Sequence, residues 1–550
     1  MIATIDGTRF QRMVIHGAAC INLRKQMINE LNVFPVPDGD TGTNMSLTMG
    51  TAAAEMKKKT ANTIAEASSI NASALLRGAR GNSGVILSLL FRGFAKAMKE
   101  LDTADGAALA GALSEGVSAA YKAVMKPAEG TILTVSRLAA NRAVEAAAEQ
   151  NKVEFVLEEA IHAGENALAD TINQNPVLKK AGVVDAGGKG FLVILQGMLD
   201  CLQGKPLPET PEETAAVREK ADFGSFQTQD ITFGYCTEFI CSRDAQKDPE
   251  LLRRFLNQLG DSLVLVDDDD IIKVHVHTNH PGKVLEEALT YGALLTIKIE
   301  NMREQHTEIL DEIKESAPSS GEETHRVAPA EKPIGVVAVC AGDGLAAIFR
   351  DLGADGVISG GQTMNPSTED ILREIENTPA ETVFVLPNNK NIIMAAQQCI
   401  SLSTEKKVLV LPTKTIPQGI AALLALEPEA GAEENFSAME SASAKVHTAE
   451  ITYAARNSDF DGFTIREGDY MALLEHQLFG TDRDIDVLLN QLAQSETYRG
   501  ADFINIFYGS DVTEAQAQSV QERFKAACPQ AEITLLAGGQ PVYYYMISAE

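Results

Sequence analysis

The sequence is short of positive charge. Its 47 lysine and arginine residues stand against 76 aspartate and glutamate residues, which gives a formal net charge of −29. Such a surface repels the phosphates of nucleic acids and of anionic lipids. We therefore expect neither a nucleic acid nor a lipid surface as a general partner.

The sequence also lacks a long apolar run. Its most apolar stretch, GFLVILQGMLDCL at residues 190–202, is too short and too interrupted to span a bilayer. The first residues, MIATIDGTRFQRM, have neither the basic start nor the apolar run of a secretory peptide. We expect no stable membrane insertion and a cytoplasmic protein.

Cysteine is scarce, with seven residues scattered over 550 positions. An odd number of widely separated cysteines is typical of reduced thiols and does not suit a disulfide framework, which agrees with a cytoplasmic protein. The apolar fraction of 45%, by contrast, is sufficient for well-buried cores. A chain of this length predicts about three or four domains.

The hydrophobic period changes twice along the chain. Residues 1–203 have apolar side chains at helical spacing, interrupted by Pro and Gly clusters, and predict an all-α domain. Polar, proline-containing segments at 204–230 and 314–333 read as linkers. Residues 231–313 have the order β-α-β-β-α-β of a ferredoxin-like α+β unit. Residues 334–550 alternate apolar strands with helices and predict a C-terminal α/β domain.

The stretch NVFPVPDGDTGTN, residues 32–44, places Asp38 and Asp40 on either side of a glycine, just before an apolar helical period. Thr43 or Asn44 is the expected N-cap of that helix. Taken alone, the D-G-D sequence is more often a capped loop than a metal site. Two carboxylates at a helix N-terminus do suit Mg²⁺ above a phosphate, because Mg²⁺ takes one or two carboxylates and completes its shell with phosphate oxygens and water.

Of three other ion and phosphate motifs, one fits and two are excluded. An EF-hand also starts D-x-D, but Gly42 and Met49 occupy its fifth and twelfth positions, which excludes it. ARGNSG at residues 79–84 is a second candidate phosphate-binding element, because Gly81 permits close backbone approach and Ser83 can donate a hydrogen bond. No G-x-x-x-x-G-K-[S/T] sequence occurs, so a Walker-type site is excluded.

Four motifs occur in order within residues 1–202: NVFPVPDGDTGTNM, GARGNSGVILS, KPAEGTILTV and VVDAGGKGF. Together they resemble the nucleotide-binding L-type domain of dihydroxyacetone kinases, as it occurs in the larger, ATP-binding subunit of bacterial fatty acid kinases. GYCTEF, KVHVHTNHPG, FYGSDV and GGQPVYYY extend this resemblance over nearly the whole chain.

The resemblance implies that the first domain is an eight-helix antiparallel barrel with ATP at one rim. It also implies two Mg²⁺ ions, with Asp38 and Asp40 as ligands. Dihydroxyacetone kinases carry a third aspartate a few residues earlier, which this chain lacks, and Asn32 is the nearest available oxygen ligand. The nucleotide contacts that the resemblance implies are Thr43, Asn44, Ser83, Gly84, Thr131 and Asp185.

The motif KVHVH places His275 and His277 on one face of a predicted strand, because side chains alternate along a strand. Cys236, on the first predicted strand of the same unit, can reach them. Two imidazoles and a thiolate suit Zn²⁺ with a fourth position open or filled by another residue. The alternative is that the histidines cap a solvated sheet face and that Cys236 is buried, and spacing alone favours this alternative. The resemblance implies a functional Cys-His-His cluster, with or without zinc.

The C-terminal domain offers no predicted catalytic residue. GADGVISGGQTMNPST, residues 353–368, is rich in small polar residues, as ligand loops often are, and a structural turn is equally compatible with it. The resemblance implies a fold like that of the fatty-acid-binding partner and a role in docking.

The reaction that the resemblance implies is transfer of the ATP γ-phosphoryl group to the carboxylate of a fatty acid, presented by a separate fatty-acid-binding protein. The product is an acyl phosphate for phospholipid synthesis. A carboxylate is ionised at pH 7, so charge neutralisation is needed and a general base is not. Arg80 and Lys126 either assist or lie on the surface. The alternatives are a kinase for dihydroxyacetone or another small polyol, and a non-catalytic ATP-binding scaffold. The sequence is also compatible with a homodimer.

Overall fold

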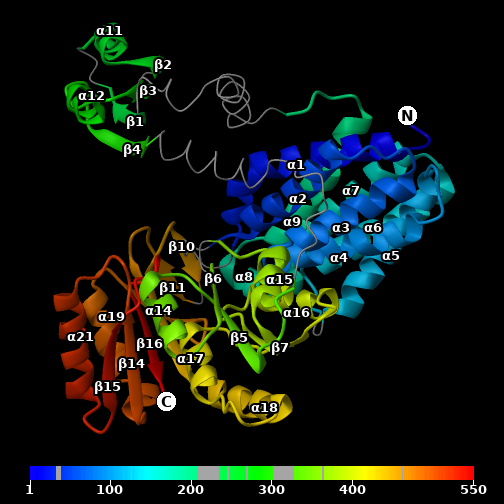
Figure 1. Cartoon of the computed structure of the whole chain (residues 1–550). Coiled ribbons are helices and arrows are strands. Elements are labelled where there is room, and N and C mark those ends of the chain that lie inside the picture. Colours follow the sequence, from blue (N-terminus) through cyan, green and yellow to red (C-terminus); the bar gives the residue numbers. More distant parts are fainter. Residues whose placement is uncertain are drawn as a thin grey trace. The chain divides into compact units, whose positions relative to one another are not determined.

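The computed structural model describes residues 1–32, 39–124, 127–208, 235–243, 247–267, 271–301, 327–361, 364–460 and 462–550. The chain divides into two compact units, one formed by Met1–Thr210 with Arg326–Glu550 and the other by Pro211–His325. Both are drawn in Figure 1, and each is described by itself. Most of the two predicted linkers lies outside the described residues, and the predicted domain boundaries stay predictions.

Helices form the N-terminal part of the first unit (Figure 1). Each long helix packs against the next, and the last packs against the first. The all-α prediction is confirmed, and the eight-helix barrel stays a prediction. The helices are α1 Gly7–Asn29, α2 Thr41–Lys58, α3 Ile64–Gly78, α4 Gly81–Met98, α5 Gly106–Ala123, α6 Ile132–Glu149, α7 Val153–Gln174, the short α8 Pro176–Ala181 and α9 Ala186–Leu202.

The helices form where the sequence combines an apolar stripe with a capping residue. On α1, Phe10, Val14 and Ile21 follow the helical repeat and are fully buried. Thr63 and Glu66 form a capping box at the start of α3, in which each side chain accepts from the backbone of the other. Apolar burial therefore determines the packing, and local caps determine where the helices begin.

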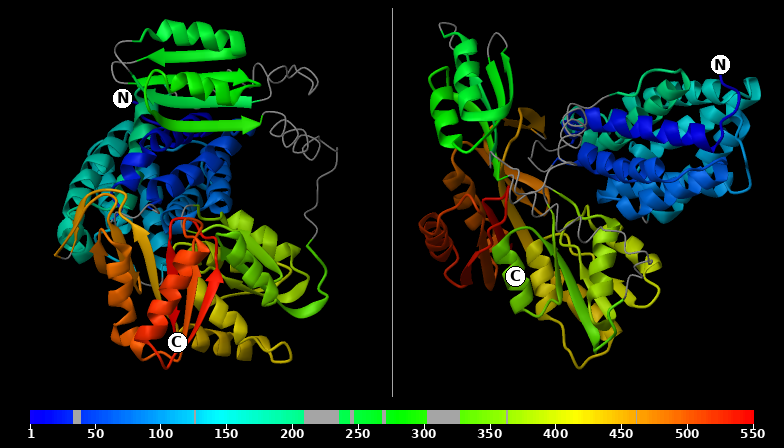
Figure 2. Two further views of the ribbon diagram at one scale, coloured as in Figure 1. Left: turned by 90° about the vertical axis from the view of Figure 1, so that its left-hand side faces the viewer. Right: turned by 45° about the horizontal axis from the view of Figure 1, so that its top comes forward.

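A parallel sheet follows in the second half of this unit. Its four strands are ordered β6-β5-β7-β8, with helices between them along the chain, which confirms the predicted α/β pattern. Figure 2 shows this green-to-yellow part of the ribbon from two further directions. Its elements are β5 Lys332–Cys340, α14 Asp343–Asp351, β6 Gly356–Ser359, α15 Thr368–Asn377, β7 Ala380–Leu386, α16 Ile393–Leu402, β8 Lys407–Val410, α17 Ile416–Leu424 and α18 Ala432–Ser443.

A second, mixed sheet completes the C-terminal part. Its six strands are ordered β13-β12-β9-β16-β14-β15, and β14 and β15 are its parallel pair. The likeness of this part to a fatty-acid-binding protein fold stays a prediction. Its elements are β9 His447–Tyr453, β10 Ser458–Phe460, β11 Phe463–Ile465, β12 Tyr470–Leu474, β13 Gln477–Asp482, α19 Ile485–Ala493, α20 Glu496–Arg499, β14 Phe503–Tyr508, α21 Glu514–Ala527, β15 Glu532–Ala537 and β16 Tyr545–Ala549.

The helices and the parallel sheet share one hydrophobic core. Buried side chains of the helices are continuous with Val337 of β5, Ile371 of α15 and Cys399 of α16. Helix α15 packs against α3, and α16 packs against α4. The loops at the ends of these elements are therefore held against the ends of the helices.

The second unit is a four-stranded antiparallel sheet with two helices. Its strands are ordered β2-β3-β1-β4, and every neighbouring pair is antiparallel. The element order is the predicted one, and the ferredoxin-like assignment stays a prediction. The elements are β1 Tyr235–Ser242, α11 Pro249–Leu259, β2 Gly260–Asp267, β3 Ile271–Thr278, α12 Pro281–Ala288 and β4 Leu294–Asn301.

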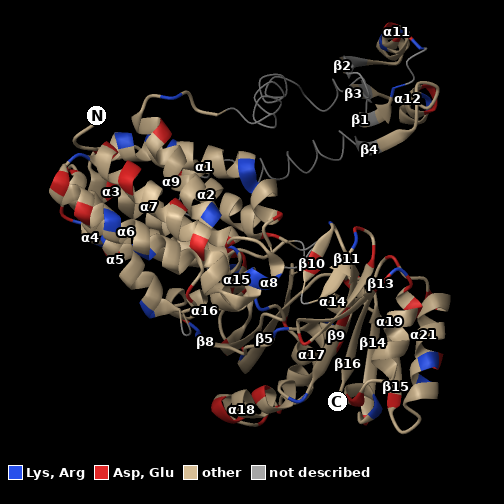
Figure 3. Cartoon of the chain, turned by 180° about the vertical axis from the view of Figure 1, so that it is seen from behind, with Lys and Arg blue, Asp and Glu red and all other residues tan. Residues whose placement is uncertain are grey.

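Acidic and basic residues are interspersed on the helices in the N-terminal part of the first unit, whereas α18, in its C-terminal part, carries acidic residues (Figure 3). Among the helices that the structure describes, none combines the length and the apolar character that crossing a bilayer requires.

Candidate functional site

The D-G-D segment leads directly into helix α2. Asp38 lies outside the described residues, whereas Asp40 is described and is the N-cap of α2. The predicted N-cap at Thr43 or Asn44 is wrong, because the helix already begins at Thr41. The physical reason is a neighbouring helix: Oδ1 of Asn29, the last residue of α1, accepts from the backbone N–H groups of Gly42 at 2.7 Å and Thr43 at 3.1 Å.

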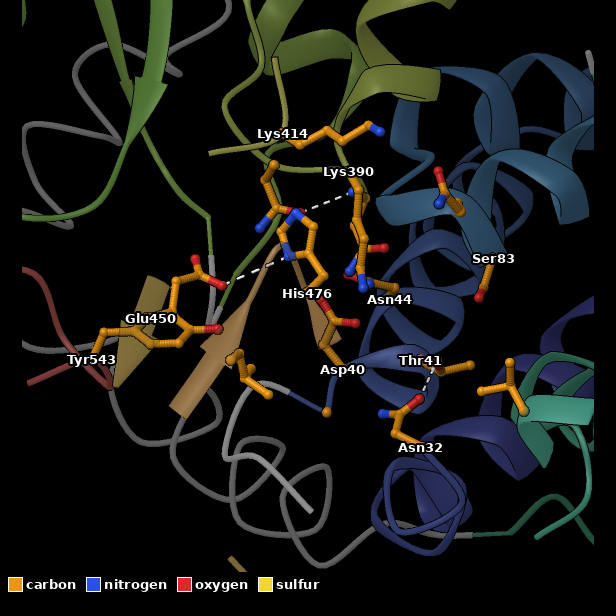
Figure 4. Close-up of a pocket in the computed structure, with 16 residues that line it drawn as sticks. Asn32, Asp40, Thr41, Asn44, Ser83, Lys390, Lys414, Glu450, His476 and Tyr543 are labelled. Carbon is orange, nitrogen blue, oxygen red and sulfur yellow. Dashed lines mark hydrogen bonds and ion pairs between the residues drawn. The ribbon is translucent and has the colours of Figure 1, made fainter. Parts of the chain in front are cut away.

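Because Asn29 caps α2, the Asp40 side chain is not needed as the cap of that helix. Asp40 makes no side-chain cap hydrogen bond and instead lines a cavity of about 330 Å³. The buried Asn44 lines the same cavity, one helical turn further along α2. Beside them, Oδ1 of Asn32 accepts from the Thr41 hydroxyl at 2.8 Å (Figure 4).

A second cavity of about 320 Å³ adjoins the first and shares Asn32, Thr41, Asn82 and Ser83 with it. Helices α2, α4, α6 and α9 all begin at its wall. The first N–H groups of a helix have no intrahelical partner and carry the positive end of the helix dipole. Four such ends around one space favour an anion, and phosphate is the usual one.

Two of the predicted nucleotide residues cap these helices. The Thr131 side chain accepts from Leu133 N–H at the start of α6, and that of Asp185 accepts from Gly188 N–H at 2.7 Å at the start of α9. Both residues line the second cavity. Burial raises the pKa of Asp185 to about 6, although its backbone hydrogen bonds oppose this shift.

Three buried polar atoms on the first cavity have no hydrogen-bond partner in the described structure. They are Nδ2 of Asn32, Oδ1 of Asn82 and Nε2 of His476. Buried polar atoms without partners are uncommon in proteins, because leaving them unpaired costs about 1–3 kcal/mol each. Three residues with such atoms line one cavity, which is compatible with a polar ligand site.

The opposite wall of the first cavity comes from the C-terminal part of the chain (Figure 4). Loops after β7 and β8 contribute Lys390 and Lys414, β9 contributes Glu450, and the β12–β13 hairpin contributes His476. None of these residues was predicted. One signal was available, because ligands of parallel α/β sheets bind beyond the carboxyl ends of the strands, and both lysines follow such ends.

The small polar loop at 353–368 brings Asn365 into this site. Asn365 is fully buried, and its Nδ2 donates to the carboxylate of Asp40 and, at 3.4 Å, to Oδ1 of Asn44. Arg80 holds the loop in turn, because its guanidinium donates to the Asn365 carbonyl at 2.8 Å and lies 3.4 Å from the Asp370 carboxylate. Arg80 is therefore engaged in a contact between the two halves of the unit. Lys126 lies outside the described residues.

Close packing at the same contact explains one glycine. Gly81 adopts a φ of +58°, and a Cβ there would lie 2.5 Å from Nδ2 of Asn44.

Thr43 and Gly84, by contrast, are absent from the residues that line either cavity. The Thr43 hydroxyl accepts from Asn29 Nδ2 at 3.0 Å, and Gly84 lies against Thr48. Their roles as phosphate contacts stay predictions.

Comparison with known proteins gives this site its context. Three family models match the chain: the DAK2 domain at residues 35–200, the middle domain of FakA-like fatty acid kinase subunits at 232–309, and the C-terminal domain of the same FakA-like subunits at 335–550. Protein YloV of Bacillus subtilis is 41% identical over 558 residues, which cover 100% of both chains. A relative from Staphylococcus haemolyticus is 40% identical over 557 residues, again with 100% of both chains covered.

The chain belongs to the FakA-like family of fatty acid kinase subunits. The resemblance inferred from the motifs is thus confirmed, and the chain is a fatty-acid-kinase-type subunit of the phosphotransferase class. A solved structure, the dihydroxyacetone kinase from C. freundii in complex with AMP-PNP and Mg²⁺, is 20% identical with a TM-score of 0.28, covering 34% of this chain and 33% of that one. That score is too low to support a conclusion.

The second unit of this FakA-like chain carries the predicted Cys-His-His cluster. The backbone register pairs Cys236 of β1 with His277 of β3, two residues along from the pairing of Glu238 with His275. The side chains of Cys236, His275 and His277 lie outside what the structure describes, so the cluster and its zinc stay predictions. In the part of the chain whose side chains are described, no group of three His, Cys, Asp or Glu residues could hold a metal ion.

Proposed function

We propose that this chain is the ATP-binding subunit that phosphorylates the carboxylate of a fatty acid, giving an acyl phosphate for phospholipid synthesis. The observation that carries the proposal is that the Asp40 carboxylate lines one of two adjoining cavities, and that four helices begin at the wall of the other. Membership of the FakA-like family supports the same reaction class.

The residues present fit a nucleotide with Mg²⁺. Asp40 offers a carboxylate, and Asn32, Thr41 and Asn44 offer neutral oxygens on the same wall of the cavity. That donor set is all oxygen, as Mg²⁺ prefers, and Mg²⁺ needs only one or two carboxylates when phosphate oxygens complete its shell. We propose Asp38 as the second carboxylate and Asn32 as the further ligand. Bound Mg²⁺ would supply charge neutralisation on the β- and γ-phosphates.

The nucleotide phosphates would lie along the helix N-termini of the second cavity. Ser83, near the start of α4, lines both cavities and is suited to donate to a phosphate oxygen between them. Thr131 and Asp185 line the far end, where their helices begin. The chain's own residues thus bind and orient the phosphates, and the ionised acceptor carboxylate needs no base.

The fatty acid would arrive on a separate binding protein. The apolar cavity between helices α1, α4, α5, α6, α7 and α9 measures about 30 Å³. A cavity already needs about 10–15 Å³ on this measure to hold one water molecule, so this one is far too small for an acyl chain. Presentation by a partner explains how such a chain could act on a long apolar substrate, with the carboxylate brought to the γ-phosphate.

The test uses the full chain with Mg²⁺-ATP and a fatty acid loaded on candidate fatty-acid-binding proteins. ADP would be quantified, and acyl phosphate would be trapped with hydroxylamine as the hydroxamate. We expect one hydroxamate for each ADP, and only when a carrier is present. Turnover of dihydroxyacetone without any turnover of fatty acid would overturn the proposal in favour of a small-polyol kinase. ATP binding without turnover of either would favour a non-catalytic scaffold.

A further inference from the structure

The two walls of the first cavity differ in charge. The helical wall carries the carboxylate of Asp40 and otherwise uncharged residues, among those that the structure describes. The cationic side chains, Lys390 and Lys414, come from the C-terminal wall, together with His476. A nucleoside triphosphate bound to the helical wall alone would contact no cationic side chain among the described residues that line that wall. The C-terminal wall supplies the charge that the helical wall lacks.

The ammonium groups of Lys390 and Lys414 differ from those of nearby lysines in having no partner within the described part of the chain. Lys332 pairs with Asp355 at 2.5 Å, Lys407 pairs with Glu433 at 2.6 Å, and Lys406 donates to the carbonyl of Glu376 at 3.0 Å. The ammonium groups of Lys390 and Lys414 have no hydrogen-bond or ion-pair partner within the described part of the chain. Both follow the carboxyl ends of parallel strands, where ligands of such sheets bind.

Backbone strain gathers at the same wall. In the described residues, the non-glycine positions with positive φ are Asn388 at 54°, Glu475 at 50°, His476 at 60° and Val542 at 72°. Asn388 precedes the Asn389–Lys390 segment of the wall, and Val542 precedes Tyr543, which also lines it. A β-branched residue at positive φ is a genuine outlier, and such positions cluster where function requires them.

The hairpin that carries His476 is built against local preference. Glu475 and His476 form the two-residue connection between β12 and β13, and both have positive φ. Such connections favour Asn-Gly, because glycine adopts positive φ without strain. A Glu-His pair at these positions strains the backbone, and the pair places the His476 imidazole on the cavity wall.

The imidazole of His476 lies beside a buried carboxylate. Its Nδ1 lies 3.7 Å from the carboxylate of Glu450, which is only 6% exposed (Figure 4). Its Nε2 is buried and without a partner in the described structure. An imidazole nitrogen that carries a proton is a hydrogen-bond donor, so Nε2 of His476 is available to donate to an anion bound at this wall.

We propose that Lys390, Lys414 and His476 form an anion-binding half-site that holds the phosphoryl group in transfer, so that the C-terminal half completes the catalytic cavity. This inference rests on the proposed function and adds to it the residues that face the γ-phosphate. An oxygen of the acceptor carboxylate forms a bond to the γ-phosphorus, and the bond to the β,γ-bridging oxygen breaks with its electrons leaving on ADP. No proton moves in this step.

The half-site meets the main requirement of that step. Charge in the transition state spreads over the three equatorial oxygens of the phosphoryl group, and cationic side chains placed there stabilise it. Lys390 and Lys414 would act as such cations, and Glu450 would act as a positioning residue through His476. The requirement for the C-terminal half would then be chemical, in addition to any role in docking a partner.

The test is a binding comparison on the full chain that needs no acceptor. Calorimetry would measure the affinity for Mg²⁺-ADP alone and for Mg²⁺-ADP with aluminium fluoride, a mimic of the phosphoryl group in transfer. The variants are Lys390→Ala, Lys414→Ala, the double variant and His476→Asn, which keeps a residue tolerant of positive φ. Lys445→Ala is the matched control, because Lys445 is exposed and is not among the residues that line the cavity.

We expect the double variant to lose at least tenfold in affinity for the aluminium fluoride complex, with less than a threefold change for ADP and no change in the control. An affinity for the fluoride complex within threefold of wild type would overturn the half-site. An equal loss for both ligands would overturn it too, because the lysines would then bind the nucleotide itself. A wild-type chain that forms no acyl phosphate would contradict the proposed acceptor, and this comparison would still decide the half-site.

Discussion

Asn365 and Asp40, 325 residues apart in the chain, meet side chain to side chain, with Nδ2 of Asn365 donating to the Asp40 carboxylate. A second contact lies nearby, where Arg456 donates to the backbone carbonyl of Asn32 at 2.5 Å. The C-terminal part thus holds both described ends of the D-G-D segment. A cation placed on Asp40 would have to share the carboxylate with an amide from the other half of the chain, which couples metal binding to that contact.

Asn365→Asp is the change that exposes this coupling. It places a second carboxylate beside Asp40, and two like charges in contact repel when no cation separates them. We expect a lower Tm in EDTA and a recovery of Tm on adding Mg²⁺-ATP. Asn365→Ala removes the donor without adding charge and should lower the free energy of unfolding by about 2 kcal/mol. Mg²⁺-ATP should raise the Tm of this variant no more than it raises the Tm of wild type. Differential scanning calorimetry with and without Mg²⁺-ATP measures both; identical behaviour of the two variants would contradict the coupling.

Asp40→Asn should abolish phosphoryl transfer. Asparagine keeps the size of the side chain and the bond from Asn365 but removes the negative charge that we propose binds Mg²⁺. Changing a residue that only supports a metal ligand typically costs roughly 10- to 100-fold in activity. Because we propose that Asp40 is itself a ligand, the loss of ADP production should be larger than that. Asp102→Asn, at an exposed position, is the matched control. A double Asp38→Ala, Asp40→Ala variant that retains activity would remove the metal assignment.

Asn29→Ala tests the cap that α1 provides for α2. Its amide oxygen accepts from two N–H groups of the first turn of α2, which otherwise have no partner. We expect a loss of about 1–2 kcal/mol in the free energy of unfolding, as for other caps. Because the same turn carries Asp40, the affinity for Mg²⁺-ATP should fall as well. Asn141→Ala, on the exposed face of α6, should change neither quantity.

The sequence predicted the elements better than it predicted the site. Helical and strand periods identified the two kinds of structure because burial of apolar side chains follows the repeat of each element. The N-cap of α2 was misplaced because the capping side chain, Asn29, belongs to another helix. Lys390, Lys414 and His476 were missed for a related reason: they lie in three separate loops, and only the order of strands in two sheets brings them to one cavity. Local patterns carry no information about that order.

Cys236→Ser tests the zinc prediction for the second unit. The register of β1 and β3 places the backbones of Cys236 and His277 opposite one another, which is compatible with a shared set of metal ligands. We expect elemental analysis of the full chain to find zinc in wild type and a clear loss in the variant. Cys241→Ala is the control, because the buried Cys241 pairs with Ile272 within the core of the sheet. Equal zinc contents in all three proteins would contradict the prediction.

Asp185 makes the stability of the helical part depend on pH. Burial raises its pKa from an ordinary value of 3.8 to about 6 in the folded chain, so the folded state holds this proton more tightly than the unfolded state does. Its contribution to stability is therefore fully present below about pH 4 and is lost as the pH rises through about 6, by as much as about 3 kcal/mol. Asp185→Asn keeps an acceptor for the Gly188 N–H but has no charge to bury. We expect this variant to gain stability over wild type at pH 8 relative to pH 5, measured by urea unfolding at both values. The variant gains because burying the ionised carboxylate costs more than burying the neutral amide. If the free energies of unfolding of the two proteins differ by the same amount at pH 5 and pH 8, Asp185 does not titrate in this range.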